Sequence, residues 1–108
     1  MIDWDPTTVL ACLETEPAVD EESYRYSLTR DGVVLALEVW HYQGDVSLAI
    51  RLENQETPFI EISMLDCREI RYVKQPHIEE LHFVTHTHGF PSGWRLQIRP
   101  HIMVKITN

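Results

Sequence analysis

The alternation of apolar and polar residues between Tyr24 and Leu52 is the feature that most constrains the fold. The segment reads YRYSLTRDGVVLALEVWHYQGDVSLAIRL, and through most of it every second residue is apolar. A period of two places these side chains on one face of an extended strand. Asp31 and Gly32 in its middle form a dipeptide typical of a two-residue hairpin turn. The segment therefore predicts antiparallel strands that share one apolar face.

Two pairing registers follow from the turns in this segment. The Asp31–Gly32 turn pairs apolar residues with each other: Tyr24 with Val39, Tyr26 with Leu37, and Leu28 with Leu35. A second turn at Gln43–Gly44 predicts a further set: Val39 with Leu48, Leu37 with Ile50, and Leu35 with Leu52. A slip of one residue would turn every apolar side chain to the other face, so we expect this parity to be well specified.

The rest of the chain continues the same pattern in shorter runs. Alternating apolar residues begin at Ile60, Ile70, Leu81, Trp94 and Ile102. Pro100 interrupts the last runs and indicates an edge or a bulge. No crossover helices separate the strands. The sequence predicts a mainly β fold over residues 24–107, an antiparallel meander of about eight strands that forms a barrel or a sandwich.

The N-terminal segment predicts one short helix over residues 5–15. Asp5 can cap it, and Pro6 suits the first helical position. Its apolar residues form one stripe: Val9, Leu10 and Leu13. Pro17 ends the helix, and an acidic loop over residues 16–23 follows. At 108 residues the chain predicts a single domain, 1–108, in which the helix covers an open end or an edge of the sheet.

Charge is distributed unevenly along the chain. Residues 1–22 hold seven acids and no Lys or Arg, and the net charge of the whole chain is −8. An acidic surface repels nucleic acid and anionic membranes, so neither is expected as a partner. No apolar run approaches a membrane span and the start lacks a signal-peptide pattern, which predicts a cytoplasmic protein. Acids 14–22 either form a solvated loop or mimic a nucleic-acid backbone.

The two cysteines, Cys12 and Cys67, lack the C-x-x-C spacing of a redox or metal motif. We expect reduced thiols that pack in the core. Cys67 together with Asp66 and His77 offers a possible nucleophile set, but packing beside apolar neighbours is the favoured interpretation. The sequence contains no Gly-rich phosphate loop and no nucleophile elbow, and no cofactor is expected.

The stretch HFVTHTHGFPSGW, residues 82–94, raises the question of a metal site. His86 and His88 would point the same way on a strand and could reach one ion, as in the cupin-like metal enzymes. Matching the apolar faces instead places Phe83 opposite Ile98, with a turn over residues 88–93. His86 then lies opposite Arg95, and a guanidinium neither ligates a metal nor favours a nearby cation.

That register predicts an outer row, a line of polar side chains on the face away from the core. Its members are His82, His86, Arg95, Gln97, Arg99 and His101. Such a row is either an ordinary solvated face or a docking surface for an acidic group. The acidic group could belong to a partner or to the chain's own N-terminal segment. A bulge in the hairpin would shift the register and change this prediction.

Trp40 is the other candidate for contact with a partner. The register turns it to the outer face, where a tryptophan often marks a contact with another element or protein. We expect the N-terminal helix to pack over it through Leu10 and Leu13, because a helix needs an apolar surface to lie on.

The order of these features resembles the small all-β immunity-type proteins of bacteria, which neutralise a toxin made by a neighbouring gene. The likeness spans residues 24–99 and rests on the segments YRYSLTRDGVVLALEV, LDCREIRYV, IEELHF and GWRLQI. It implies a cytoplasmic binding protein without a cofactor. It carries no catalytic motif to transfer.

These features predict a non-enzymatic cytoplasmic domain that binds another protein by surface contact. Its expected contact residues are His82, His86, Arg95, Arg99, His101 and Trp40. One alternative is a cupin-like metal enzyme centred on His86 and His88. Another is a barrel that holds a small apolar ligand, although 108 residues leave little room for a cavity.

Overall fold

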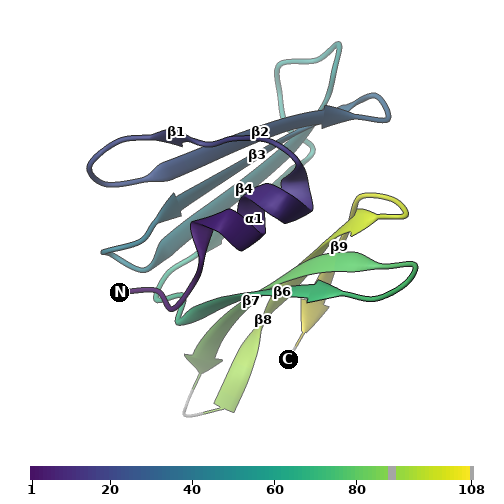
Figure 1. Cartoon of the computed structure of the whole chain (residues 1–108). Coiled ribbons are helices and arrows are strands. Elements are labelled where there is room, and N and C mark those ends of the chain that lie inside the picture. The colour runs from purple at the N-terminus through teal and green to yellow at the C-terminus, as the bar shows by residue number, and fades with distance from the viewer. Residues whose placement is uncertain (88–89, 108) are drawn as a thin grey trace.

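The computed structural model of the protein describes residues 1–87 and 90–107, with the backbone alone at residues 86, 87, 90, 91 and 107. In chain order the elements are α1 (Pro6–Leu13), β1 (Ala18–Val19), β2 (Tyr24–Arg30), β3 (Val33–Trp40), β4 (Asp45–Leu52), β5 (Ile60–Met64), β6 (Glu69–Lys74), β7 (Glu79–Thr87), β8 (Phe90–Arg99) and β9 (Met103–Thr107). The strands of this described part form two antiparallel sheets that face each other (Figure 1). The mainly β prediction is confirmed, as a sandwich rather than a barrel.

Each sheet follows the chain order. The first contains β1 to β5 and the second contains β6 to β9, so strands within a sheet pair with their neighbours in sequence, while the chain passes from one sheet to the other between β5 and β6. This arrangement confirms the predicted meander of hairpins. The predicted acidic loop over residues 16–23 contains a strand that the sequence did not indicate: in β1, Ala18 pairs with Arg25 and Val19 with Tyr24.

The β2–β3 hairpin has the predicted register. Tyr26 lies opposite Leu37, and Leu28 lies opposite Leu35. Asp31 and Gly32 both take a positive φ, 53° and 82°. This is the backbone of a two-residue turn whose twist matches that of the flanking strands.

The predicted β3–β4 register is wrong by two residues. Val39 lies opposite Val46 instead of Leu48. The loop contains four residues, 41–44, and closes with a 2.9 Å hydrogen bond from the Gly44 N–H to the Trp40 carbonyl. Because the error is an even number, the apolar face is preserved and Val39 stays buried.

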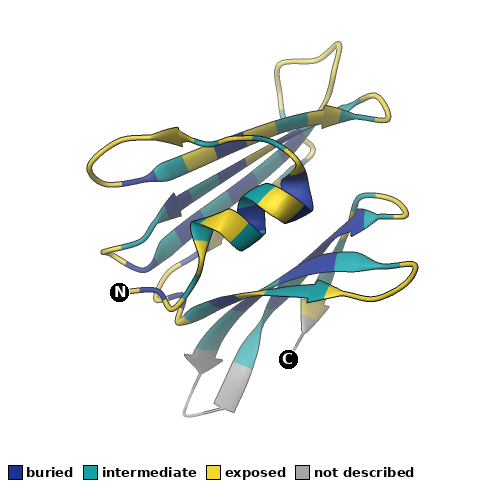
Figure 2. Ribbon diagram, viewed as in Figure 1, coloured by how far each residue is buried: buried dark blue, intermediate teal, exposed yellow. Residues whose placement is uncertain are grey.

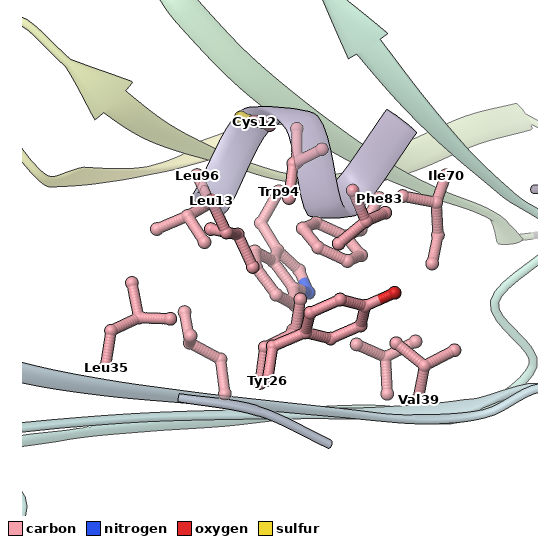
Figure 3. Packing of buried hydrophobic residues seen from close by; sticks show 14 of the residues in the cluster. Cys12, Leu13, Tyr26, Leu35, Val39, Ile70, Phe83, Trp94 and Leu96 are labelled. Carbon is pink, nitrogen blue, oxygen red and sulfur yellow. The ribbon is translucent and has the colours of Figure 1, made fainter. Parts of the chain in front are cut away.

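The core lies between the inner faces of the two sheets. Figure 3 shows the Tyr26 ring reaching from the first sheet towards Trp94 and Phe83 of the second. The rings of Phe83 and Trp94 stack with their centroids 4.0 Å apart. The buried Tyr26 hydroxyl donates to the Pro6 carbonyl at 3.2 Å, which ties the sheet to the start of α1. Each of these large side chains stabilises the fold by about 1.5–3 kcal/mol.

Helix α1 is shorter than the predicted 5–15 span. The Asp5 side chain accepts from the Thr7 N–H at 2.9 Å and caps the first turn. Glu14 ends the helix with a left-handed φ of 56°. No helix in the described part of the chain has the length and apolar character needed to cross a membrane.

The position of α1 confirms one expectation and corrects another. The helix closes one side of the sandwich, between the sheets (Figure 1). Its buried residues Val9, Cys12 and Leu13 join the core that the two sheets share. The prediction that the helix covers Trp40 is wrong, because Trp40 alternates with the buried Val39 and lies on the other face of β3.

Candidate functional site

The β7–β8 hairpin decides where the histidine-rich stretch lies. The predicted pairing of Phe83 with Ile98 is wrong, because Phe83 lies opposite Trp94. Strand β8 begins at Phe90, so Gly93 pairs with Val84 inside the sheet instead of forming part of a turn. The shift is again an even number of residues, and Phe83 keeps its place in the core.

A bulge alters the end of the predicted outer row. Glu80 lies opposite Gln97, but the preceding residue Glu79 lies opposite Arg99, which leaves Ile98 without a partner on β7. An extra residue of this kind reverses the alternation that follows it. Arg99 therefore turns to the same side as α1, and the prediction that it stands beside His82 on the outer face is wrong.

Arg99 joins the end of the helix to the four-stranded sheet. Its guanidinium donates to the Cys12 carbonyl at 3.0 Å and lies 2.6 Å from the Glu14 carboxylate. It also pairs with Glu79, which accepts a hydrogen bond from the Tyr72 hydroxyl. A cation at the C-terminus of a helix is favourable, because the last carbonyls carry partial negative charge. An acidic partner for Arg99 therefore comes from the chain's own N-terminal segment, namely Glu14.

The remaining outer face of this sheet contains a partly buried polar network. Lys105 Nζ lies 3.0 Å from Glu80 Oε2 and 3.2 Å from Gln97 Oε1. His82 Nε2 lies 3.3 Å from the other Glu80 oxygen. The Gln97 amide donates to the His101 carbonyl at 3.0 Å. Burial alone would raise the pKa of Glu80, but the hydrogen bonds from Lys105 and His82 hold that pKa below its ordinary value.

These contacts leave little of the outer row for a partner. The prediction that histidines stand beside arginines holds for His82, which lies opposite Arg95. The sequence had placed His86 opposite Arg95 instead. Arg95 Nε is buried and has no hydrogen-bond partner among the described residues. His101 is exposed. Binding of a partner through this face stays a prediction.

The proposed metal pair falls outside the described residues, which include neither His88 nor the side chain of His86. Within the described residues, no group of three or more His, Cys, Asp or Glu side chains is arranged to hold a metal ion. The cysteines are free and buried, as expected. Burial raises the pKa of Cys12 to about 12 and that of Cys67 to about 11, so neither thiol is a ready nucleophile.

The two sheets differ in charge. Residues 18–65, which form the five-stranded sheet, contain nine acids and three bases. Residues 66–108, which form the four-stranded sheet, contain four acids, six bases and five of the six histidines. The N-terminal residues 1–17 add four acids and no base. The excess of acids therefore lies on the first sheet and on the N-terminal segment.

Aromatic side chains gather at one end of that acidic half, and we call this surface the aromatic end. Its members are Trp4, Tyr24, His41 and Tyr42, whose rings contact one another in series. Successive ring centroids lie 5.0 Å apart from Trp4 to Tyr24, 5.2 Å from Tyr24 to His41 and 4.1 Å from His41 to Tyr42. Figure 1 shows the N-terminus, the β1–β2 loop and the β3–β4 turn together at this end, on the left of the view.

The segments that meet at the aromatic end carry five acids: Asp3 and Asp5 on either side of Trp4, Glu21 and Glu22 in the β1–β2 loop, and Asp45 directly after the β3–β4 turn. None of them has an ion-pair partner in the part of the chain that the structure describes. Arg25 lies 3.9 Å from both Asp20 and Glu38 and so adds no unpaired positive charge. A hollow of about 500 Å³ extends this surface past Trp4 towards residues 69–73 of β6.

A second exposed apolar region lies between β5 and β9, and we call it the open side. A hollow of about 100 Å³ there is lined by residues of both sheets, among them Phe59, Ile60 and Met103. Phe59 and Met103 are exposed, as is Ile106, although register places Ile106 opposite the buried Trp94. Figure 2 shows α1 on the opposite side, where its buried residues close the sandwich.

Sequence reasoning singled out Trp40, which precedes His41 in the chain, but it missed the aromatic end. Its rings come from three separate parts of the chain, and a 3.0 Å hydrogen bond from the Ile2 N–H to the His41 carbonyl joins the first part to the third. A local motif search has no signal for such a group. The charge difference between the sheets could have been counted from the sequence, had the boundary near residue 65 been known.

No protein-family model matches this sequence, and no curated protein is significantly similar to it. Among solved structures, a chain of the contact-dependent growth inhibition toxin–immunity protein complex from Klebsiella pneumoniae 342 has the same fold, with a TM-score of 0.83. The match covers 96% of this chain and 94% of that chain, at 17% sequence identity. This likeness concerns the fold, and it confirms the small all-β fold that the resemblance to immunity-type proteins implied.

Proposed function

We propose that this chain is a non-enzymatic, cytoplasmic, immunity-like protein that binds a toxin protein by surface contact. The observation that carries the proposal is the shared fold with a chain of a toxin–immunity protein complex, over 96% of the present chain. The sequence resemblance to immunity-type proteins favours the immunity member of such a pair.

The charge of the chain supports the same proposal. With nine acids against three bases on the five-stranded sheet, the molecule attracts a partner that carries a basic surface. Complementary charge speeds the encounter of two proteins and disfavours partners of the wrong sign. Speed matters for an inhibitor that must capture its target before the target acts.

Co-expression tests the proposal. The protein encoded by the neighbouring gene is induced in a bacterial expression host with and without this chain, and growth is recorded. We expect induction alone to stop growth, and co-expression to restore it with a one-to-one complex that can be purified. A control strain expresses an unrelated acidic β-protein and should stay arrested. If the products of both flanking genes neither arrest growth nor bind this chain, the proposal is wrong.

A further inference from the structure

We infer that the aromatic end is the surface that docks the toxin, against a basic patch of that protein. The inference rests on the proposed function and adds to it the face of the molecule and the chemistry of the partner.

The types of side chain at this end favour tight binding. Trp and Tyr are enriched among the residues that dominate binding energy at interfaces, because they bury a large area with few rotatable bonds. Tyr42 is 62% exposed. Trp4, Tyr24 and His41 are each partly exposed behind it. A partner would therefore meet a continuous series of rings.

The backbone beneath these rings is held in place before any partner arrives. The Gly44 N–H donates to the Trp40 carbonyl at 2.9 Å, and the Gly44 carbonyl accepts from the Cys67 N–H at 2.7 Å. The Ile2 N–H donates to the His41 carbonyl at 3.0 Å. These bonds join the β3–β4 turn to the N-terminus and to the segment before β6. A preorganised surface loses less conformational entropy on binding.

The charge around the rings selects the occupant. The acids of the segments that meet here, such as Glu22 and Asp45, have no ion-pair partner among the described residues, so a basic surface can pair with them. A second copy of this chain would bring a further net charge of −8 and the same acids. Repulsion therefore disfavours a homodimer through this end.

The outer face of the four-stranded sheet and the open side fit a basic partner less well. On the outer face of the four-stranded sheet, the ammonium of Lys105 is already bound to Glu80 and Gln97. The open side is apolar, with the acids of the β4–β5 loop on one sheet and His101 at the turn before β9 on the other. Among the described residues, neither surface has a series of aromatic rings in contact with one another.

Calorimetric titration of the purified chain with the protein encoded by the neighbouring gene, the candidate toxin, tests the inference through matched variants. Tyr42→Ala removes an exposed ring of the aromatic end, and Phe59→Ala removes a ring of similar exposure, 62% against 58%, on the open side. Glu22→Lys and Glu56→Lys make the same change of charge at the aromatic end and in the β4–β5 loop. We expect Tyr42→Ala to weaken binding about 30-fold and Glu22→Lys about tenfold. Both control variants should stay within about threefold of the wild type.

The outcomes separate the inference from the function on which it rests. If the wild type binds the toxin while Tyr42→Ala and Glu22→Lys bind as tightly as the controls, the inference is wrong and the function stands. If Phe59→Ala alone weakens binding, the open side is the docking surface. If the wild type does not bind, both fail. Tyr42→Phe, which keeps the ring, and urea unfolding of each variant show whether a loss of binding reflects misfolding.

Discussion

Gly93 gives a sharp test of how β7 and β8 pair. It lies opposite Val84, inside the sheet, with a positive φ of 151°. A Cβ atom at this position would stand 1.9 Å from the Phe83 carbonyl oxygen and 3.0 Å from the carbonyl carbon. Both atoms belong to the backbone, so replacing Gly93 with alanine must move one strand away from the other.

The size of the effect follows from these distances. Real Cβ atoms essentially never come closer than 3.0 Å, so a contact at 1.9 Å requires a local separation of 1.1 Å. Overpacking of this kind costs about 1–3 kcal/mol. A side chain forced to this backbone conformation costs about 1–3 kcal/mol more. We expect Gly93→Ala to lower the free energy of unfolding by about 4 kcal/mol, a large part of what a small domain has.

Urea unfolding followed by tryptophan fluorescence measures this change, since Trp94 stacks on Phe83 beside the substitution. Gly32→Ala is the control: its φ is 82°, and nothing lies within 4 Å of a Cβ there, so only about 1–2 kcal/mol should be lost. If both variants lose the same amount, the observed β7–β8 register is wrong. That result would favour the register expected from the sequence, in which Gly93 belongs to a turn.

Three further predictions concern the ion pairs of Lys105 and Arg99 and the two buried thiols. Lys105→Met leaves Glu80 buried without its cation, so the free energy of unfolding should fall by about 2 kcal/mol in urea titrations at pH 7. The fold lowers the pKa of Glu80 below its ordinary value of 4.5. The stability that the Glu80–Lys105 pair contributes is therefore fully present above that ordinary pKa, and it is lost as the pH falls through the lowered one. The loss caused by Lys105→Met should therefore shrink at acidic pH, and an unchanged loss would exclude the pair as its source. Arg99→Met should release the end of α1, seen as faster hydrogen exchange in the helix while the exchange of β3 stays slow. Cys12 and Cys67 should resist a thiol reagent in the folded protein and react once urea unfolds it, and rapid labelling of the native chain would contradict their burial.

The sequence predicted the fold class and the faces of the strands, but not every register. The Asp31–Gly32 turn has a specific backbone geometry, so the hairpin that it joins could be aligned residue by residue. The β3–β4 and β7–β8 hairpins have turns whose length the residues do not determine. Where apolar residues recur at every second position, a shift of two leaves the same face buried, so the pattern fixes parity and leaves the register open.

Two local features defeated the prediction of the outer row. Gly93 and Pro91 are typical turn residues, yet both lie in β8. Gly93 is required there because the Phe83 backbone leaves no room for a side chain. The bulge at Ile98 turned Arg99 towards α1, and a bulge depends on contacts of the strand with the rest of the fold. The aromatic end could not be predicted at all, since its rings meet only after both the N-terminus and the β3–β4 turn are in place.

We have proposed that an acidic surface of this chain captures a basic toxin. Calorimetric titration of the wild-type chain with the protein encoded by the neighbouring gene, at about 50 mM and about 300 mM salt, tests it directly because salt screens exposed charges. We expect a one-to-one complex whose affinity falls as the salt concentration rises. No binding at either salt concentration, or an affinity that salt leaves unchanged, would contradict it.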